Sequence, residues 1–121
     1  MTNAINWFEL PTVDFGRAVK FYSEILGEDL QVMECDGIQM GMLPNFTKEQ
    51  GVGGHISYGT DVQPSQSGTM VFLNGGDDLN GILNKVAGAG GEVVMPKTEA
   101  PGGYMGVFLD SEGNRVAIHN P

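Results

Sequence analysis

The chain contains the same pattern twice, and this internal repeat constrains the fold more than any other feature of the sequence. Residues 5–59 and 68–119 each contain a predicted strand, a helix that ends at a glycine, and then several short strands. The copies are offset by about 62 residues, which indicates duplication of one βαβββ unit and not a long repeat array. We therefore expect a single α+β domain over residues 1–121, in which curved mixed sheets surround a cleft. Its parts are module 1 (1–60), a connector (61–67) and module 2 (68–121).

Each copy carries one amphipathic helix. In the first, apolar residues recur at i, i+3, i+4 and i+7 from Phe15 to Leu26, with Asp14 as the expected N-cap and Gly27 just past the end. The second helix is expected to begin after residues 77–78 and to end around residues 88–90. Both helices should bury one face beneath a sheet.

Short runs of apolar residues predict eight strands around these helices. Asp36-Gly37 is typical of a hairpin turn, and residues 111–114 predict a second turn. Two segments, Pro44–Gly51 and Lys97–Gly103, are expected to be loops long enough to cover a cleft. The predicted strands are 5–10, 29–35, 38–43, 52–59, 69–74, 92–95, 104–109 and 115–119.

The charge balance excludes some classes of partner. Fifteen acidic and six basic residues give a net charge of −9, which disfavours nucleic acids and anionic membranes. We expect no signal peptide, and no apolar run approaches the roughly 18 residues that a membrane span needs. The single Cys35 excludes an internal disulfide. A cytoplasmic protein that forms homodimers is the expectation.

Three segments carry a resemblance to a known family. The opening WFELP, the helix RAVKFYSEILG and the closing GYMGVFLDSEGNRVAIH resemble the vicinal oxygen chelate superfamily. This superfamily includes glyoxalase I, bleomycin-resistance proteins and extradiol dioxygenases. The chain is most similar to glyoxalase-related proteins of undefined function, through its GTMVFLN strand and KTEAPGG segment. The resemblance implies paired βαβββ modules, but the fold hosts several chemistries.

The resemblance also implies where a metal would bind. In metal-dependent members the ligands come from the first and last strands of each module, and the corresponding positions are Trp7, His55, Thr69 and Ala117. Only His55 is a usual metal donor, so we expect no metal cofactor of the glyoxalase type. An alternative divalent-metal site would combine Glu9, His55 and His119, whose donor types suit Zn²⁺, Fe²⁺ or Ni²⁺.

Strand alternation selects the residues expected to line the cleft. If Phe8 and Leu10 pack beneath the first helix, Trp7 and Glu9 face the opposite side. The alternatives are that Trp7 is packed in an interface, that Glu9 pairs with a basic residue on a dimer surface, and that His55 is solvated at a strand start. The strand methionines either fill the core or line an adaptable pocket. The predicted ligand-binding residues are Trp7, Glu9, His55, Thr69, Tyr104 and His119.

Three functions are compatible with this sequence. The first is a binding protein for a small organic molecule, which needs only a cleft. The second is a glyoxalase-related lyase or isomerase in which Glu9 or His55 is the catalytic general base, with or without a metal. The third is a module used only for association.

Overall fold

The first half of the chain forms a four-stranded sheet covered by a helix. We describe residues 4–44 and 51–120 of a computed structural model. In this half, strand β1 (Trp7–Pro11) is followed by helix α1 (Phe15–Leu26) and then by β2 (Gln31–Cys35), β3 (Ile38–Met42) and β4 (Gly53–Tyr58). The strand order is β1-β4-β3-β2, with β1 and β4 parallel and the other neighbours antiparallel.

The second half repeats this arrangement. Strand β5 (Val71–Asn74) is followed by helix α2 (Leu79–Ala89), β6 (Glu92–Ala100), β7 (Gly103–Leu109) and β8 (Arg115–Asn120). The order β5-β8-β7-β6, with only β5 and β8 parallel, matches the first sheet strand for strand. The predicted α+β fold of two tandem βαβββ modules with mixed sheets is confirmed.

The helices begin and end where the sequence predicts. The side chain of Asp14 accepts a hydrogen bond from the Arg17 backbone N–H at 3.1 Å, and Gly27 ends α1 with φ of 74°. Asp78 caps α2 in the same way, and Gly90 ends it with φ of 109°. Glycine has no β-carbon, so its backbone adopts these left-handed conformations at little cost.

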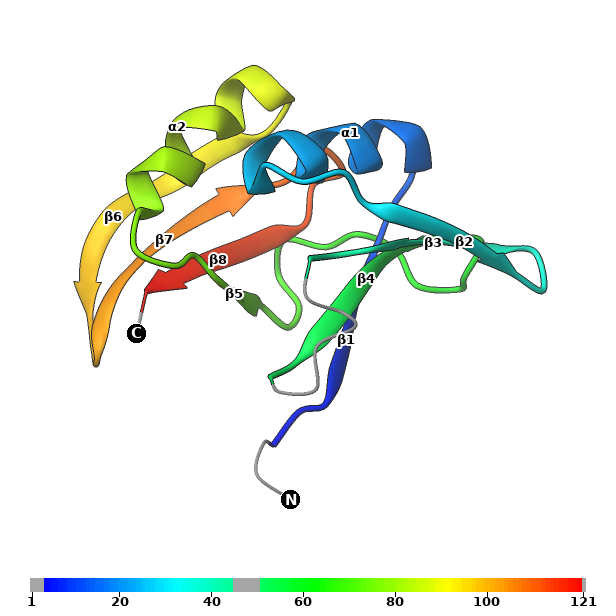
Figure 1. Ribbon diagram of the computed structural model, residues 1–121, viewed down its shortest axis with the longest axis horizontal. Coiled ribbons are helices and arrows are strands. Elements are labelled where there is room, and N and C mark those ends of the chain that lie inside the picture. The colour runs from blue at the N-terminus through cyan, green and yellow to red at the C-terminus, as the bar shows by residue number, and fades with distance from the viewer. Residues whose placement is uncertain (1–3, 45–50, 121) are drawn as a thin grey trace.

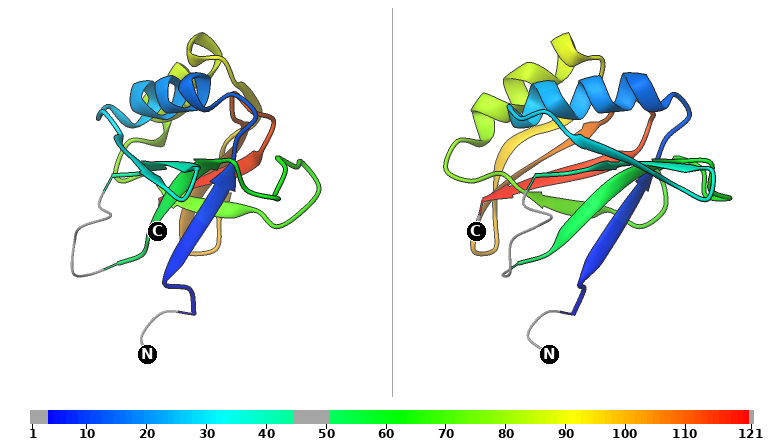
Figure 2. Two further views of the ribbon diagram at one scale, coloured as in Figure 1. Left: turned by 90° about the vertical axis from the view of Figure 1, so that its right-hand side faces the viewer. Right: turned by 45° about the vertical axis from the view of Figure 1, so that its right-hand side comes forward.

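The two helices lie side by side on the same side of the two sheets (Figures 1 and 2). Beneath them, inward side chains of both sheets and both helices form one continuous core. The edge of the Phe21 ring packs on Tyr22, and Phe21 also contacts Phe108 of the second module. The buried core residues are Leu10, Ala18, Phe21, Tyr22, Ile25, Leu30, Leu43, Ile56, Leu73, Leu79, Leu83, Val86, Phe108, Val116 and Ile118.

Polar contacts from the β7–β8 turn connect the modules. The buried Tyr22 hydroxyl donates a hydrogen bond to Asp110 at 2.7 Å, and Asn114 donates to the Pro11 carbonyl at 2.8 Å. The Arg17 guanidinium forms an ion pair with Glu112 at 2.7 Å. Asp110 and Asn114 flank the predicted turn, and they also hold α1 and β1 against the second sheet.

One loop prediction is wrong. Most of Lys97–Gly103 is strand, because β6 continues to Ala100 and β7 begins at Gly103. The pairing register shifts twice between Val93 and Thr98, around Pro96, whose nitrogen cannot donate to the ladder. The other predicted loop, Pro44–Gly51, falls largely on residues 45–50, outside the described residues. No helix among the described residues is long and apolar enough to cross a membrane.

Candidate small-molecule site

The face of the first sheet that lies opposite α1 carries the predicted site residues of that module. Leu10 and Ile56 are paired neighbours in the core, so the adjacent positions on both strands point the other way. Glu9 pairs with His55 in the parallel ladder, and Trp7 lies two residues earlier on β1. We call this surface the open face of the first sheet. As predicted, Trp7 and Glu9 point away from the helix.

Three of these side chains form a hydrogen-bonded chain. The Trp7 indole Nε1 donates to Nδ1 of His55 at 2.8 Å, and Nε2 of His55 lies 3.1 Å from Oε1 of Glu9. The Trp7 and His55 rings are tilted by 38° with centroids 5.9 Å apart. His55 is only 8% exposed, whereas Trp7 is 39% exposed. His55 is therefore a buried link between two accessible side chains, and the alternative of a solvated histidine is wrong.

The hydrogen bond that Trp7 donates defines the tautomer of His55. An indole N–H can only donate, so Nδ1 of His55 accepts and the ring proton lies on Nε2, where it is donated to the Glu9 carboxylate. Both ring nitrogens are thus engaged in the neutral imidazole. Glu9 retains a second oxygen and its side chain is 33% exposed. Within the described chain, its hydrogen-bond partner is His55.

The other predicted ligand-binding residues do not join this group within the described chain. His119 lies on β8, where its ring packs edge-on against Phe72 at 6.1 Å. Thr69 precedes β5 and is exposed. Tyr104 alternates with Met105, the ladder partner of His119, so it faces the other side of the second sheet. There the Lys97 ammonium lies 4.7 Å from its ring centroid.

The strand methionines lie outside the core cluster beneath the helices, although Met42 is itself buried, at 8% exposed. Met42 is the ladder partner of His55, and Met40 is the partner of both Ser57 and Met33, which places all three methionines on the open face. In the second sheet, Met105 pairs with His119 on the corresponding face. None of these methionines belongs to the buried core cluster. Their placement agrees with the interpretation of an adaptable lining more than with that of core filling.

The donor set does not fit the metal site that the resemblance implies. The Leu10–Ile56 pair of the first module corresponds to Leu73–Ile118 of the second, which aligns Trp7 with Met70 and His55 with Ala117. The position that we assigned to Thr69 is therefore occupied by Met70, because Val71 and Leu73 face the helix side. A tryptophan, a methionine and an alanine leave His55 as the one strong donor, and its nitrogens are engaged.

The alternative metal site is also not assembled. Among the described residues, no three His, Cys, Asp or Glu side chains gather closely enough to hold a metal ion. Glu9 and His55 are together, but His119 lies on the other sheet. We derive no chemistry through a metal.

Two buried polar features were not found from the sequence. Ser57 is fully buried, and its hydroxyl has no hydrogen-bond partner among the described residues. Glu112 lies in the turn, yet its side chain is completely buried against α1. Neither had a sequence signal, because serine and glutamate are usually exposed in turns and strand ends.

The chain consists of two βαβββ modules, each with a mixed sheet, and the first sheet carries polar and aromatic side chains on the face opposite the helices. This architecture defines a glyoxalase-like protein. A family model described as "Glyoxalase/Bleomycin resistance protein/Dioxygenase superfamily" matches residues 4–118. The chain belongs to this superfamily. The comparison with curated proteins finds no match.

Solved structures show the same fold at low identity. A glyoxalase/bleomycin resistance protein from Albidiferax ferrireducens T118 has a TM-score of 0.69 and 14% identity, covering 98% of this chain and 100% of that one. The fosfomycin resistance protein FosX from Mesorhizobium loti has a TM-score of 0.66 and 12% identity, covering 100% and 93%. Glyoxalase I from Zea mays has a TM-score of 0.68 and 18% identity, covering 94% of this chain and 44% of that one. At such identities the likeness concerns the fold alone.

Proposed function

We propose that the protein binds a small organic molecule on the open face of its first sheet, with Trp7 as the wall and Glu9 as the polar anchor. The observation that carries this proposal is the hydrogen-bonded chain from Trp7 through His55 to Glu9. Each side chain in it fixes the next, so the indole and the carboxylate are presented in a defined geometry. Preorganised groups lose little conformational entropy when a ligand arrives.

The chemistry of these groups favours a cationic ligand. An exposed indole face attracts a flat ring or a cation, and such a contact is worth roughly 0.5–2 kcal/mol. The carboxylate beside it compensates positive charge, and the net charge of −9 raises the local concentration of cations. Met33 and Met40, half-buried on the same face, supply an apolar floor that adapts its shape.

Trp7 provides a direct assay because it is the only tryptophan in the chain. Its indole N–H should give a single side-chain signal in a ¹H–¹⁵N correlation spectrum. Titration with 1-methylquinolinium should shift this signal, and uncharged quinoline should shift it less. Glu9→Gln should weaken the binding of 1-methylquinolinium more than that of quinoline. Glu34 is an exposed acid on β2, and Glu34→Gln should change the affinity for neither compound. A Trp7 indole signal whose chemical shift does not change with either compound at millimolar concentration would refute the proposed site.

A lyase or isomerase is the second candidate, and the hydrogen bonds favour Glu9 as its base. His55 holds both of its nitrogens in hydrogen bonds, so it would have to break one before it accepted a proton. Glu9 has a free oxygen on the accessible surface. In this function Glu9 removes a proton and His55 positions it. Turnover that survives Glu9→Gln but not His55→Gln would contradict this assignment.

We also propose that the functional form is a homodimer with a two-fold interface. Each open face is a single wall, so a second wall has to come from another molecule if the ligand is to be enclosed. Strands β1 and β5 are at the edges of their sheets and offer unpaired backbone groups to a partner. The interface should bury more than about 1,000 Å² in total. Light scattering that gives a monomer at tens of micromolar would refute the dimer.

A further inference from the structure

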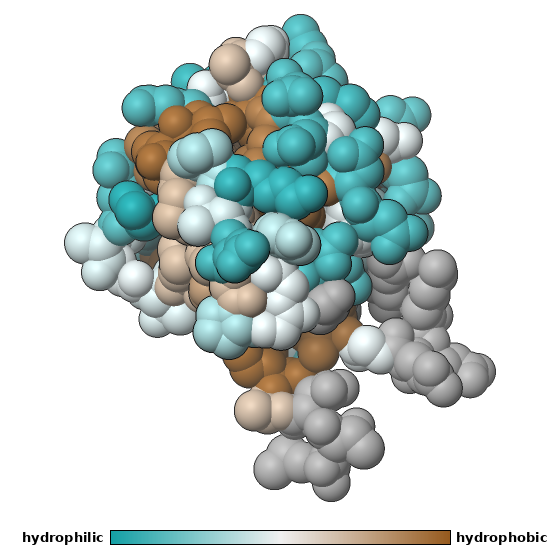
Figure 3. Space-filling model, turned by 90° about the vertical axis from the view of Figure 1, so that its left-hand side faces the viewer, coloured by the Kyte–Doolittle hydropathy of each residue, from teal (hydrophilic) through white to brown (hydrophobic). Residues whose placement is uncertain are grey.

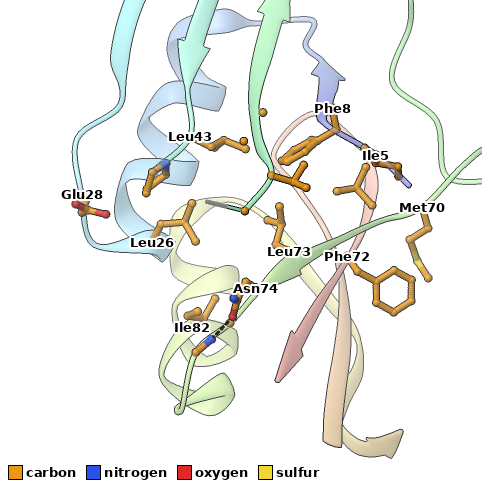
Figure 4. A pocket seen from close by; sticks show the side chains of 18 of the residues that line it. Ile5, Phe8, Leu26, Glu28, Leu43, Met70, Phe72, Leu73, Asn74 and Ile82 are labelled. Atoms are coloured by element: carbon orange, nitrogen blue, oxygen red, sulfur yellow. Dashed lines mark hydrogen bonds between the residues drawn. The ribbon is translucent and has the colours of Figure 1, made fainter. Parts of the chain in front are cut away.

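A groove of about 910 Å³ separates the two modules on a different part of the molecule from the open-face site. It runs along the edge strand β5 and faces the N-terminal ends of β1 and β4 and the C-terminal end of α1. Phe8 lines it, whereas Trp7, Glu9 and His55 do not. Figure 4 shows the side chains of Phe8, Leu26, Leu43 and Leu73 gathered around this space. The groove is therefore independent of the function proposed above.

The walls of the groove are set by close packing. A β-carbon at Gly54 would overlap the ring of Phe8, so this ring rests directly on the β4 backbone. Gly75, at the other end, is approached in the same way by Leu79 and Ile118. Neither wall can move inward without displacing the core.

Two large apolar side chains at the groove remain in water. Ile5 and Val52 line it and are 59% and 40% exposed. Figure 3 shows hydrophobic surface near the N-terminal end of the described chain, at the lower edge of that view. Contiguous exposed apolar surface in a concave site is typical of ligand binding.

The charges around the groove select the class of ligand. Glu28 is the one ionisable residue among the described residues that line it, and no basic side chain is present there. Asn74 accepts a hydrogen bond from Gly76 through its carbonyl oxygen. With one carboxylate among the described lining residues and a net charge of −9, the groove favours a cation beside Glu28 over an anion.

We propose that this inter-module groove binds a small amphiphile with an apolar chain or ring and a cationic head group. The apolar part lies between Phe8, Leu26 and Leu73, and the head group lies at Glu28. The volume matches that of sites for drug-sized molecules, roughly 300–1,000 Å³.

The test uses two probes with the same chain and opposite head groups. Octyltrimethylammonium and octyl sulfate, both below their critical micelle concentrations, are titrated into the full chain by calorimetry. We expect the cation to bind and the anion to bind at least about fivefold more weakly, the ratio that one surface charge supplies. Equal binding of the two probes, or no heat from the cation, would overturn the proposal.

Matched variants locate the binding site. Glu28→Lys should reverse the preference for the head group, while Glu24→Lys, the same charge change on the exposed side of α1, should not. Ile82→Trp should abolish binding by filling the groove from α2, and Val71→Trp should do the same from β5 if the first variant fails to fold. Binding that survives both filling variants would refute the groove.

The open-face site is distinguished by one further variant. Glu9→Gln should leave octyltrimethylammonium binding unchanged, since Glu9 is remote from the groove lining. If Glu9→Gln abolishes it and the filling variants do not, the cation binds at Trp7 instead. A second copy of the chain is the competing occupant: cation binding that appears only on dilution to the monomer would show that the dimer covers the groove, and would overturn the proposal.

Discussion

Replacing Glu112 by glutamine should destabilise the protein by weakening the junction between the two modules. The Glu112 side chain is completely buried at the module junction. Its carboxylate accepts hydrogen bonds from the backbone N–H groups of Val13 and Asp14 at 2.8 and 2.6 Å. It also accepts from Arg17 at 2.7 and 3.1 Å and from the Ser111 hydroxyl at 2.9 Å. It thus joins the start of α1 to the β7–β8 turn.

The magnitude follows from these contacts. A glutamine has one acceptor oxygen, and its amide N–H groups would point at donors, so at least one hydrogen bond to a charged group is lost and another weakened. Such bonds contribute about 1.5–3 kcal/mol each. The Arg17 side chain is 52% exposed, and water replaces part of what it loses. We expect Glu112→Gln to lower the unfolding free energy by about 2–4 kcal/mol and Tm by about 8–16 °C.

The effect should depend on pH with a defined sign. Burial alone would raise the pKa of Glu112, but the hydrogen bonds from Arg17, Asp14, Ser111 and Val13 outweigh it and hold that pKa below its usual value. A depressed native pKa gives stability that is present above the unfolded value of about 4.3 and is lost as pH falls below it. The difference between wild type and Glu112→Gln should therefore be full at pH 7 and shrink in acid.

Urea unfolding at several pH values measures this difference. Glu24→Gln is the control, since it removes one exposed carboxylate from α1. A double-mutant cycle with Arg17→Met should show coupling between Arg17 and Glu112 at pH 7. A loss no larger than that of Glu24→Gln, or one that is equally large in acid, would refute the view that the buried carboxylate holds the modules together.

Three further substitutions test the packing, each by urea unfolding. Tyr22→Phe should cost about 1–3 kcal/mol, because it removes the donor to buried Asp110, and a neutral result would contradict the importance of that bond. Gly54→Ala should cost about 1–3 kcal/mol, because its new β-carbon would overlap the Phe8 ring. Gly88→Ala should instead stabilise by about 0.5–1 kcal/mol, since it lies in α2 with no atom within 4 Å of the new β-carbon; a loss there would refute the open environment.

The fold could be predicted from local signals. Asp14 and Gly27 mark the ends of α1 because the capping bond and the left-handed conformation are both local, and Asp36-Gly37 forms its turn with positive φ at both residues. The extension of β6 through Pro96 could not be predicted in this way. It depends on pairing with β7, which is a tertiary interaction that overrides the local preference.

The sequence was enough to predict which face of the sheet Trp7 and Glu9 occupy, but not which residues from other strands lie beside them. Alternation along one strand was enough to place Trp7 and Glu9 together, because period two is fixed by the backbone. Which strands meet across the molecule is not fixed by alternation, and within the described chain His119 and Tyr104 lie on the other sheet from His55. Thr69 was misplaced by one residue, and a shift of one residue moves a side chain to the other face of the sheet.

The differences between the modules indicate which one selects the ligand. At positions that correspond, the first sheet has Trp7, Glu9 and His55, and the second has Met70, Phe72 and Ala117. Only the first set contains hydrogen-bonding groups, and they are already bonded to one another in a fixed order. An apolar surface adapts to many ligands, whereas a fixed carboxylate and indole select among them. If the two open faces meet in a dimer, specificity should therefore depend on the first module and tolerance of ligand shape on the second. Exchanging Met70 or Phe72 for leucine should then alter the range of aromatic cations that bind, while Glu9→Gln should weaken all of them.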